Sequence, residues 1–280
     1  MNEIRTDILN GQDHYGVDDA LASKTMGKHK LNRVQWSPVL QGWMNITGLY
    51  NRKYVEELNW NTPDTYSMNL KYSDSLKYNG YWYKLQIPQS YNHHRTEGYP
   101  LVVYLHGGLD FELENEDSGY WYGNLMSQNA DEQIIFVAPT KNDVDWQSEK
   151  VMDVCIDVMK KCNVDANRIY LTGLSMGGRG TILVCSELPD VFAAIAVLSP
   201  HHYPTDYTLA YIQSSIPVLL HHSENDSVSD YSKAIEMRNI FENQNNNLLW
   251  IGGMLGHSGW ESILYGNESN VNWLLSHSKT

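Results

Sequence analysis

From residue 64 onward, apolar and polar positions follow patterns that change in a regular order along the chain. Residues 64–88 alternate apolar or aromatic with polar side chains around turn residues at "SDS" and "NG", which is typical of antiparallel hairpin strands. Residues 99–108, "YPLVVYLHGG", then form a continuous apolar run that ends in glycines. A run of this kind predicts a central strand that is buried on both faces of its sheet.

After this run, the pattern predicts strands and helices in alternation to the end of the chain. The strands are expected at 133–140, 167–175, 192–200, 216–226 and 247–257. The helices are expected at 120–132, 146–164, 176–190, 229–244 and 258–278. In the second helix Ser148 precedes apolar residues at helical spacing and is of a type that caps helices, and Pro189 ends the third. Such alternation predicts an α/β fold, with a mostly parallel central sheet, helices on both faces and an antiparallel lead-in hairpin.

The first 62 residues follow no long period and contain no catalytic motif. They carry Trp36, Trp43 and Trp60 among polar residues, with one short helix expected near "NRKYVEEL". Their aromatic content indicates a segment that packs on something. We therefore divide the chain into an accessory segment, 1–62, and a main domain, 63–280. The segment could act as a lid, a docking arm or a contact in a homo-oligomer.

Composition and charge narrow the classes of partner. Of the 280 residues, 42% are hydrophobic and 19% charged, which favours a folded domain with a sizeable core over disorder. The net charge of −13 disfavours nucleic acid and anionic lipid as partners. The apolar runs fall short of the roughly 18 residues of a membrane helix. The N-terminus resembles no signal peptide, which favours the cytoplasm unless a signal has been removed.

Cysteines and paired histidines offer little support for a metal site or a disulfide framework. The three cysteines, Cys155, Cys162 and Cys185, are interpreted as buried thiols. The pairs at 93–94, 201–202 and 221–222 lack spaced carboxylate partners, so we interpret them as packing at strand ends. The expectation is a site without metal or cofactor.

Residues 173–177 form the pattern G-x-S-x-G around Ser175. The pattern alone is weak, but here it lies between a predicted buried strand and a predicted helix, where a nucleophile elbow belongs. Small residues at 173 and 177 would let the backbone turn sharply against its neighbours. The hydroxyl would then project beyond the carboxyl ends of the strands, where open α/β sheets bind ligands. A structural serine in a tight turn is the alternative.

A serine nucleophile needs a general base, and the base needs an acid that orients it. In this architecture the chain order is Ser, then Asp or Glu, then His. His257 follows the last predicted strand on a glycine-rich loop, and Asp226 follows the strand before it. We predict that Ser175, Asp226 and His257 form the triad, with Glu224 as the alternative acid.

Backbone N–H groups would hold the oxyanion. Met176, directly after the nucleophile, offers its N–H at a helix start, where the helix dipole adds positive character. The second donor is expected from the "HGGLD" loop, at Gly108 with Leu109 as the alternative, while His106 is expected to order that loop. For substrate contacts we predict Leu109 and the aromatic side chains of Trp121 and Trp260, together with Tyr120, which could stack on rings or sugars.

The motifs "YLHGG", "GLSMGG", "HSENDSV" and "GHSGW" occur in the order and spacing of α/β-hydrolase esterases. Over about residues 77–280, the chain resembles the branch that contains feruloyl esterases, polyhydroxybutyrate depolymerase-like esterases and predicted peptidases. Ser223 stands where glycine is usual in the acid motif of this branch, so the acid loop could be shaped differently.

The resemblance implies a serine esterase that forms an acyl-enzyme, acting on a small-molecule or glycan-linked ester such as an acyl or feruloyl ester. Two other functions stay open. The same triad could cleave peptides, and the fold could serve a non-catalytic binding protein.

Overall fold

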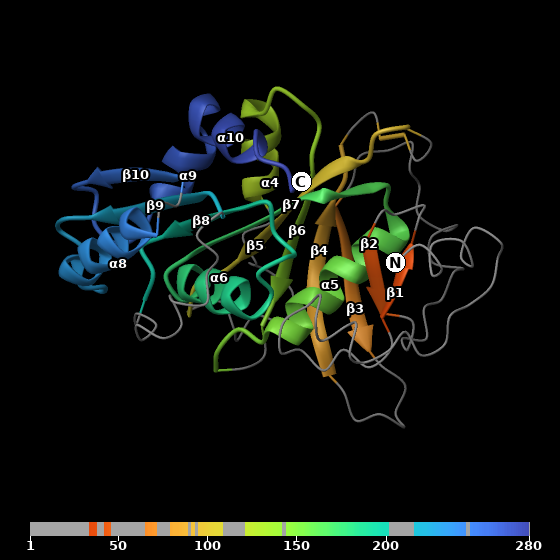
Figure 1. Cartoon of the computed structure of the whole chain (residues 1–280), viewed down its shortest axis with the longest axis horizontal. Coiled ribbons are helices and arrows are strands. Elements are labelled where there is room, and N and C mark those ends of the chain that lie inside the picture. The colour runs from red at the N-terminus through yellow and green to blue at the C-terminus, as the bar shows by residue number, and fades with distance from the viewer. Residues whose placement is uncertain are drawn as a thin grey trace.

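The computed structural model places the main domain and a small part of the segment before it (Figure 1). The structure describes residues 34–37, 42–45, 65–71, 79–88, 91–92, 95–108, 121–141, 144–201, 216–244 and 247–279. The expected helix near residues 51–58, the "SDS" turn, His93–His94, Leu109 and Tyr120 lie outside these residues.

In the part of the chain that the structure describes, an eight-stranded sheet forms the centre of the domain, with strand order β10-β9-β8-β7-β5-β6-β4-β3. Its strands are β3 (Thr65–Lys71), β4 (Asn79–Gln86), β5 (Tyr99–Leu105), β6 (Ile135–Thr140), β7 (Val164–Leu174), β8 (Ala194–Leu198), β9 (Val218–Ser223) and β10 (Leu248–Gly253). The pairs β3–β4 and β4–β6 are antiparallel, and every other pair is parallel. The predicted α/β-hydrolase fold with an antiparallel lead-in is confirmed.

Helices cover both faces of this sheet (Figure 1). They are α4 (Trp121–Asn129), α5 (Ser148–Lys161), α6 (Met176–Glu187), α8 (Tyr231–Asn243), α9 (Trp260–Tyr265) and α10 (Glu268–Leu275). Helices α5, α6 and α8 pack in one apolar cluster with the sheet, and α4, α9 and α10 pack in the other.

Strand β5 shows why the central strands read as unbroken apolar runs. All seven of its residues are buried. Leu101, Val103 and Leu105 join the cluster under α5 and α6, whereas Val102 and Tyr104 join the opposite cluster. Because successive side chains of a strand point to opposite faces, a strand covered on both faces needs apolar residues at every position.

Three local expectations are wrong. Ser148 is the first residue of α5 rather than its cap: Gln147 holds the cap position without a side-chain bond, and the Ser148 hydroxyl donates to Glu187. Asn79 and Gly80 lie inside β4 rather than in a turn, because Asn79 pairs with Lys71 of β3.

The third is the closing segment, which forms two helices instead of one. The chain breaks at Gly266, and the side chain of Asn267 then accepts the backbone N–H of Asn270 as the cap of α10. Such a cap satisfies an N–H group that would otherwise lack a partner at a helix start. Helical spacing alone could not reveal this break.

Two short strands represent the first 62 residues in the described part of the chain. β1 (Val34–Ser37) and β2 (Gly42–Asn45) pair antiparallel, with Trp36 opposite Trp43, and β2 lies against α5. This contact fits the expectation that the segment packs on the main domain. The division at residue 62 and the proposed lid, docking or oligomer roles stay predictions, because most of the segment lies outside the described residues.

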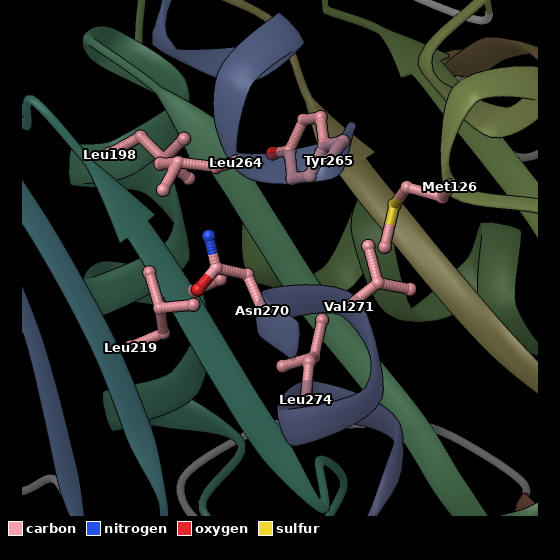
Figure 2. Close-up of a pocket in the computed structure, with 9 residues that line it drawn as sticks. Met126, Leu198, Leu219, Leu264, Tyr265, Asn270, Val271 and Leu274 are labelled. Atoms are coloured by element: carbon pink, nitrogen blue, oxygen red, sulfur yellow. The ribbon is translucent and has the colours of Figure 1, made fainter. Parts of the chain in front are cut away.

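A small apolar pocket lies between the sheet and the helices α9 and α10 (Figure 2). Leu198 and Leu219 of the sheet face Leu264 and Leu274 of the helices across it. The Tyr265 hydroxyl at its edge is hydrogen-bonded to Thr172. Because its lining is mostly apolar, we interpret this pocket as imperfect packing between the sheet and the helices that cover it.

Among the residues described, none of the helices has the length and apolar character needed to cross a membrane.

Candidate active site

Ser175 lies on the sharp turn between β7 and α6. Its backbone φ of 58° is in the left-handed region, where a residue with a side chain is strained. Neighbouring backbone holds the turn: the Ser175 N–H donates to Leu198 O at 2.9 Å, and the N–H groups of Arg179 and His201 donate to Ser175 O. These bonds keep the hydroxyl at the carboxyl ends of the parallel strands.

The glycines around Ser175 are required by contact with neighbouring backbone. A Cβ on Gly177 would lie 1.8 Å from the carbonyl oxygen of Leu105, and one on Gly173 would lie 2.6 Å from the same atom. These separations are far below any contact that a side chain tolerates, and backbone cannot move aside cheaply. The elbow approaches β5 so closely that only glycine fits at positions 173 and 177, which explains the G-x-S-x-G pattern.

Ser175, His257 and Asp226 lie in a hydrogen-bonded row. His257 Nε2 is 2.9 Å from Ser175 Oγ, and His257 Nδ1 is 2.8 Å from Asp226 Oδ2. His257 belongs to the loop of residues 254–259 that follows β10, which we call the histidine loop. The structure thus brings together the three residues that the sequence singled out. They lie on the turn after β7 and the loops after β9 and β10, at the carboxyl ends of these strands.

Asp226 lies on the loop of residues 224–230 after β9, which we call the acid loop. Its side chain is fully buried, and its Oδ1 accepts the N–H groups of Val228 and Ser229. Burial alone would raise its pKa, but the Ser229 N–H and the His257 ring more than offset this, so the pKa lies below its usual value. Glu224, the alternative acid, is exposed.

His222 makes a contact with the acid that the sequence did not reveal. Its Nε2 lies 3.4 Å from Asp226 Oδ2 and 3.2 Å from Ser229 O. It is fully buried at the end of β9, as the packing interpretation expects, and burial lowers its pKa. In the sequence, this contact could have been suspected only from the position of His222, four residues before Asp226.

His106 orders the loop after β5. Its Nδ1 donates to Gly107 O at 2.7 Å, and its Nε2 accepts the Lys141 N–H at 3.1 Å, which together fit the neutral ring. Burial lowers the pKa of His106 to about 4, and the rings of His106 and Trp146 pack in a T-shaped arrangement. This arrangement fixes the backbone of the loop from which the second oxyanion donor is expected.

The loop after β5 runs beside the elbow. A Cβ on Gly107 would lie 3.7 Å from Ser175 Cβ, and one on Gly108 would lie 2.6 Å from Met176 Sδ. Gly108 therefore packs directly on the side chain of Met176, the first residue of α6. Leu109, the alternative donor and a predicted substrate contact, lies outside the described residues.

The predicted aromatic contacts are placed unequally. Trp260 is 7% exposed, its ring lies 4.0 Å from that of His221 between centroids, and its Nε1 donates to Gly256 O. It therefore supports the histidine loop, and contact with substrate stays a prediction. Trp121 begins α4, but its side chain is not among those described.

All three cysteines are buried thiols, as the sequence indicated. Within the described ranges, no cluster of three or more His, Cys, Asp or Glu side chains is placed to hold a metal ion.

The buried histidines predict a loss of stability in mild acid. His106, with a pKa of about 4, and His221, whose pKa burial and His222 lower to about 3, are neutral in the folded protein. In the unfolded chain the same two histidines bind protons near pH 6.5. Their neutral, buried state therefore contributes fully to the free energy of unfolding above that pH, and this contribution declines as the pH falls toward 4. His106 alone should account for about 3 kcal/mol of this decline.

Urea unfolding at pH 7.5, 6, 5 and 4.5 measures the decline, and the matched variant is His106→Asn, which cannot titrate there. We expect the free energy of unfolding of this variant to depend less steeply on pH than that of the wild type. Equal slopes would contradict the assignment of His106.

Comparison with known proteins places the chain in a family. The model of the Esterase family, described as "Putative esterase", matches residues 81–274. A bifunctional acetylxylan esterase/xylanase from Neocallimastix patriciarum is 35% identical over 147 residues, which is 48% of this chain and 20% of that protein. The chain thus spans about a fifth of the length of this relative.

Solved structures share the fold. A thermostable esterase has a TM-score of 0.63 at 23% identity over 77% of this chain and 64% of its own, just under two thirds of its length. A ferulic acid esterase has a TM-score of 0.58 at 19% identity over 77% of this chain and 99% of its own. A CE1 ferulic acid esterase from Anaeromyces mucronatus has a TM-score of 0.55 at 18% identity over 79% of this chain and 94% of its own.

Proposed function

The chain belongs to the Esterase family of carboxylic ester hydrolases, and we propose that Ser175, His257 and Asp226 are the triad through which it cleaves its substrate. The observation that carries this proposal is the unbroken row from Ser175 Oγ through both ring nitrogens of His257 to Asp226 Oδ2. With Nδ1–H donated to the carboxylate, Nε2 is left with its lone pair toward the serine hydroxyl.

The reaction has two steps. Nε2 of His257 takes the proton of Ser175 as Oγ attacks the ester carbonyl, and the imidazolium then protonates the leaving alcohol. Water, activated by the same ring, releases the acyl group and restores the serine. Throughout, Asp226 stays ionised and holds the ring in the useful tautomer, which its lowered pKa supports.

Two backbone N–H groups stabilise the oxyanion. Met176 supplies one at the positive end of α6, and Gly108 supplies the other from the loop that His106 orders. Removing a side-chain oxyanion donor in a serine protease raises the barrier by about 3 kcal/mol, which sets the scale expected for each donor here. This chemistry requires neither a metal nor an organic cofactor.

The proposed substrate is a small acyl or feruloyl ester linked to a glycan. Support comes from what the similar proteins are named for: an acetylxylan esterase is related in sequence, and ferulic acid esterases share the fold. The net charge of −13 favours a neutral polysaccharide over a polyanion.

A panel of substrates tests this proposal. Acetylated xylan, methyl ferulate, p-nitrophenyl acetate and p-nitrophenyl octanoate are compared with fluorogenic dipeptide amides, while a fluorophosphonate probe reports on the serine. We expect probe labelling, and a larger kcat/KM for the acetyl or feruloyl esters than for the octanoyl ester. Faster cleavage of the amides would favour a peptidase, and absence of both labelling and turnover would favour a binding protein.

The acid can be identified by a pair of isosteric variants. Asp226→Asn should lower kcat by about 10⁴-fold, because an amide that donates to Nδ1 selects the wrong tautomer of His257. Glu224→Gln, an exposed change two residues away, should leave kcat close to the wild-type value. Initial rates on p-nitrophenyl acetate measure both, and a reversed ranking would assign the acid to Glu224.

A further inference from the structure

The two loops that carry the acid and the base leave the sheet side by side. β9 and β10 are parallel neighbours whose last paired residues are Ser223 and Gly253. The Glu224 N–H donates to Gly253 O at 2.7 Å, which continues the ladder one residue past the strands. Beyond this point, other contacts must hold the acid loop and the histidine loop together.

The side chain of Ser223 makes such contacts. It is fully buried at the end of β9. Its hydroxyl donates to Asn225 Oδ1 at 2.9 Å, with Gly253 O as a second acceptor at 3.2 Å, and it accepts the Gly256 N–H at 3.0 Å. Asn225 Oδ1 accepts the same Gly256 N–H at 3.0 Å. One buried hydroxyl thus connects a residue of each loop.

Gly256 is the residue directly before His257, so these bonds act next to the base. Its φ of 92° is in the left-handed region that glycine adopts readily. Its carbonyl accepts Trp260 Nε1 at 3.1 Å, so polar groups on both sides of Gly256 have fixed partners. The direction in which the chain enters His257 is therefore set by Ser223 and Asn225 on one side and by Trp260 on the other.

We propose that Ser223 is a positioning residue for His257: its hydroxyl, together with Asn225, ties the histidine loop to the acid loop and sets the alignment of the ring with Ser175 and Asp226. The residue acts through His257 and does not touch the substrate. This inference rests on the proposed function, because it assigns a role only if His257 is the base.

Ser223→Ala is the primary variant. We expect kcat on p-nitrophenyl acetate to fall about tenfold, because poorer alignment of His257 should raise the barrier by about as much as one ordinary hydrogen bond contributes. KM should change less than twofold, since the hydroxyl holds the base and not the substrate. Ser223→Thr, which retains a hydroxyl, should restore most of the rate. The matched control is Ser227→Ala, an exposed serine of the acid loop that should keep the wild-type kcat.

A double-variant cycle separates positioning from a general loss of structure. If Ser223 acts only through the ring, Ser223→Ala should have no further effect on the residual rate of His257→Ala. A general loosening of the site would lower that residual rate by the same factor as in the wild type. A multiplied effect, or a wild-type kcat in Ser223→Ala, would overturn the proposal.

Asn225→Ala gives a second test if Ser223→Ala does not fold, because Asn225 is exposed. We expect a fall in kcat of about threefold, again absent in the His257→Ala background, because Ser223 still accepts the Gly256 N–H. In that case a wild-type kcat for Asn225→Ala would overturn the proposal. Ser175→Ala, assayed in parallel, distinguishes the failures: if it retains activity, the proposed function itself is wrong.

Discussion

Ser175→Ala is expected to lower kcat on aryl and acyl esters by about 10⁶-fold, the scale of loss when the nucleophile of a serine hydrolase is removed. Without Oγ no acyl-enzyme can form, and the remaining rate comes from the oxyanion donors and substrate binding alone. The fold should survive, because the bonds that hold the elbow are made by the backbone N–H and carbonyl of Ser175. Labelling by a fluorophosphonate should disappear with the activity.

Ser186→Ala is the matched control for this change. Ser186 lies in the last turn of α6, about 16 Å from Ser175 along the helix axis, and its hydroxyl donates to the carbonyl of Leu183. Its kcat should equal that of the wild type, and both variants should unfold at a similar temperature. Ester turnover by Ser175→Ala at more than one percent of the wild-type rate would exclude Ser175 as the nucleophile.

Gly177→Ala is expected to have the largest effect on stability, at least about 3 kcal/mol, because its Cβ would overlap the carbonyl oxygen of Leu105 at 1.8 Å. Relief requires that α6 move away from β5 or that the end of β5 distort, and both elements belong to the core. A domain of ordinary stability, about 5–15 kcal/mol, would lose a large part of its free energy of unfolding. Urea unfolding and soluble yield measure the effect.

Gly107→Ala is the control for the general effect of replacing glycine. Its Cβ would meet Leu174 O and Ser175 Cβ at 3.7 Å, an ordinary contact, so its free energy of unfolding should change by less than about 1 kcal/mol. If Gly177→Ala were as stable as Gly107→Ala, the close approach of the elbow to β5 would be wrong.

The sequence predicted the sheet and most helices because the patterns that define them are local. β5 reads as apolar at each position because both of its faces are covered, and the end of α6 before Pro189 follows from a single residue. The break at Gly266–Asn267 was missed because the apolar spacing continues across it, and only the cap shows that a new helix begins. The role of Ser148 depended on Glu187, 39 residues away, which no local pattern contains.

For the site, the sequence could predict which three side chains come together, but not the surrounding contacts that position them. Ser175, Asp226 and His257 each follow a parallel strand, so the topology brings them to one edge of the sheet. Their supports, such as the contact of His222 with Asp226 and of Ser223 with Gly256, depend on the register of β9 against β10 and on loop conformation. The catalytic roles themselves stay predictions until the variants are measured.

β10, which carries the histidine loop, is an edge strand of the sheet. Within the described residues it pairs with β9 alone, and its residues are partly buried or exposed, in contrast to the fully buried β8 on the other side of β9. Edge elements with few buried contacts open more often than the core, without unfolding of the whole domain. The working lifetime of this protein is therefore expected to be set by the rate at which β10 detaches from the sheet, and the hydrogen bonds between the two loops should slow that step.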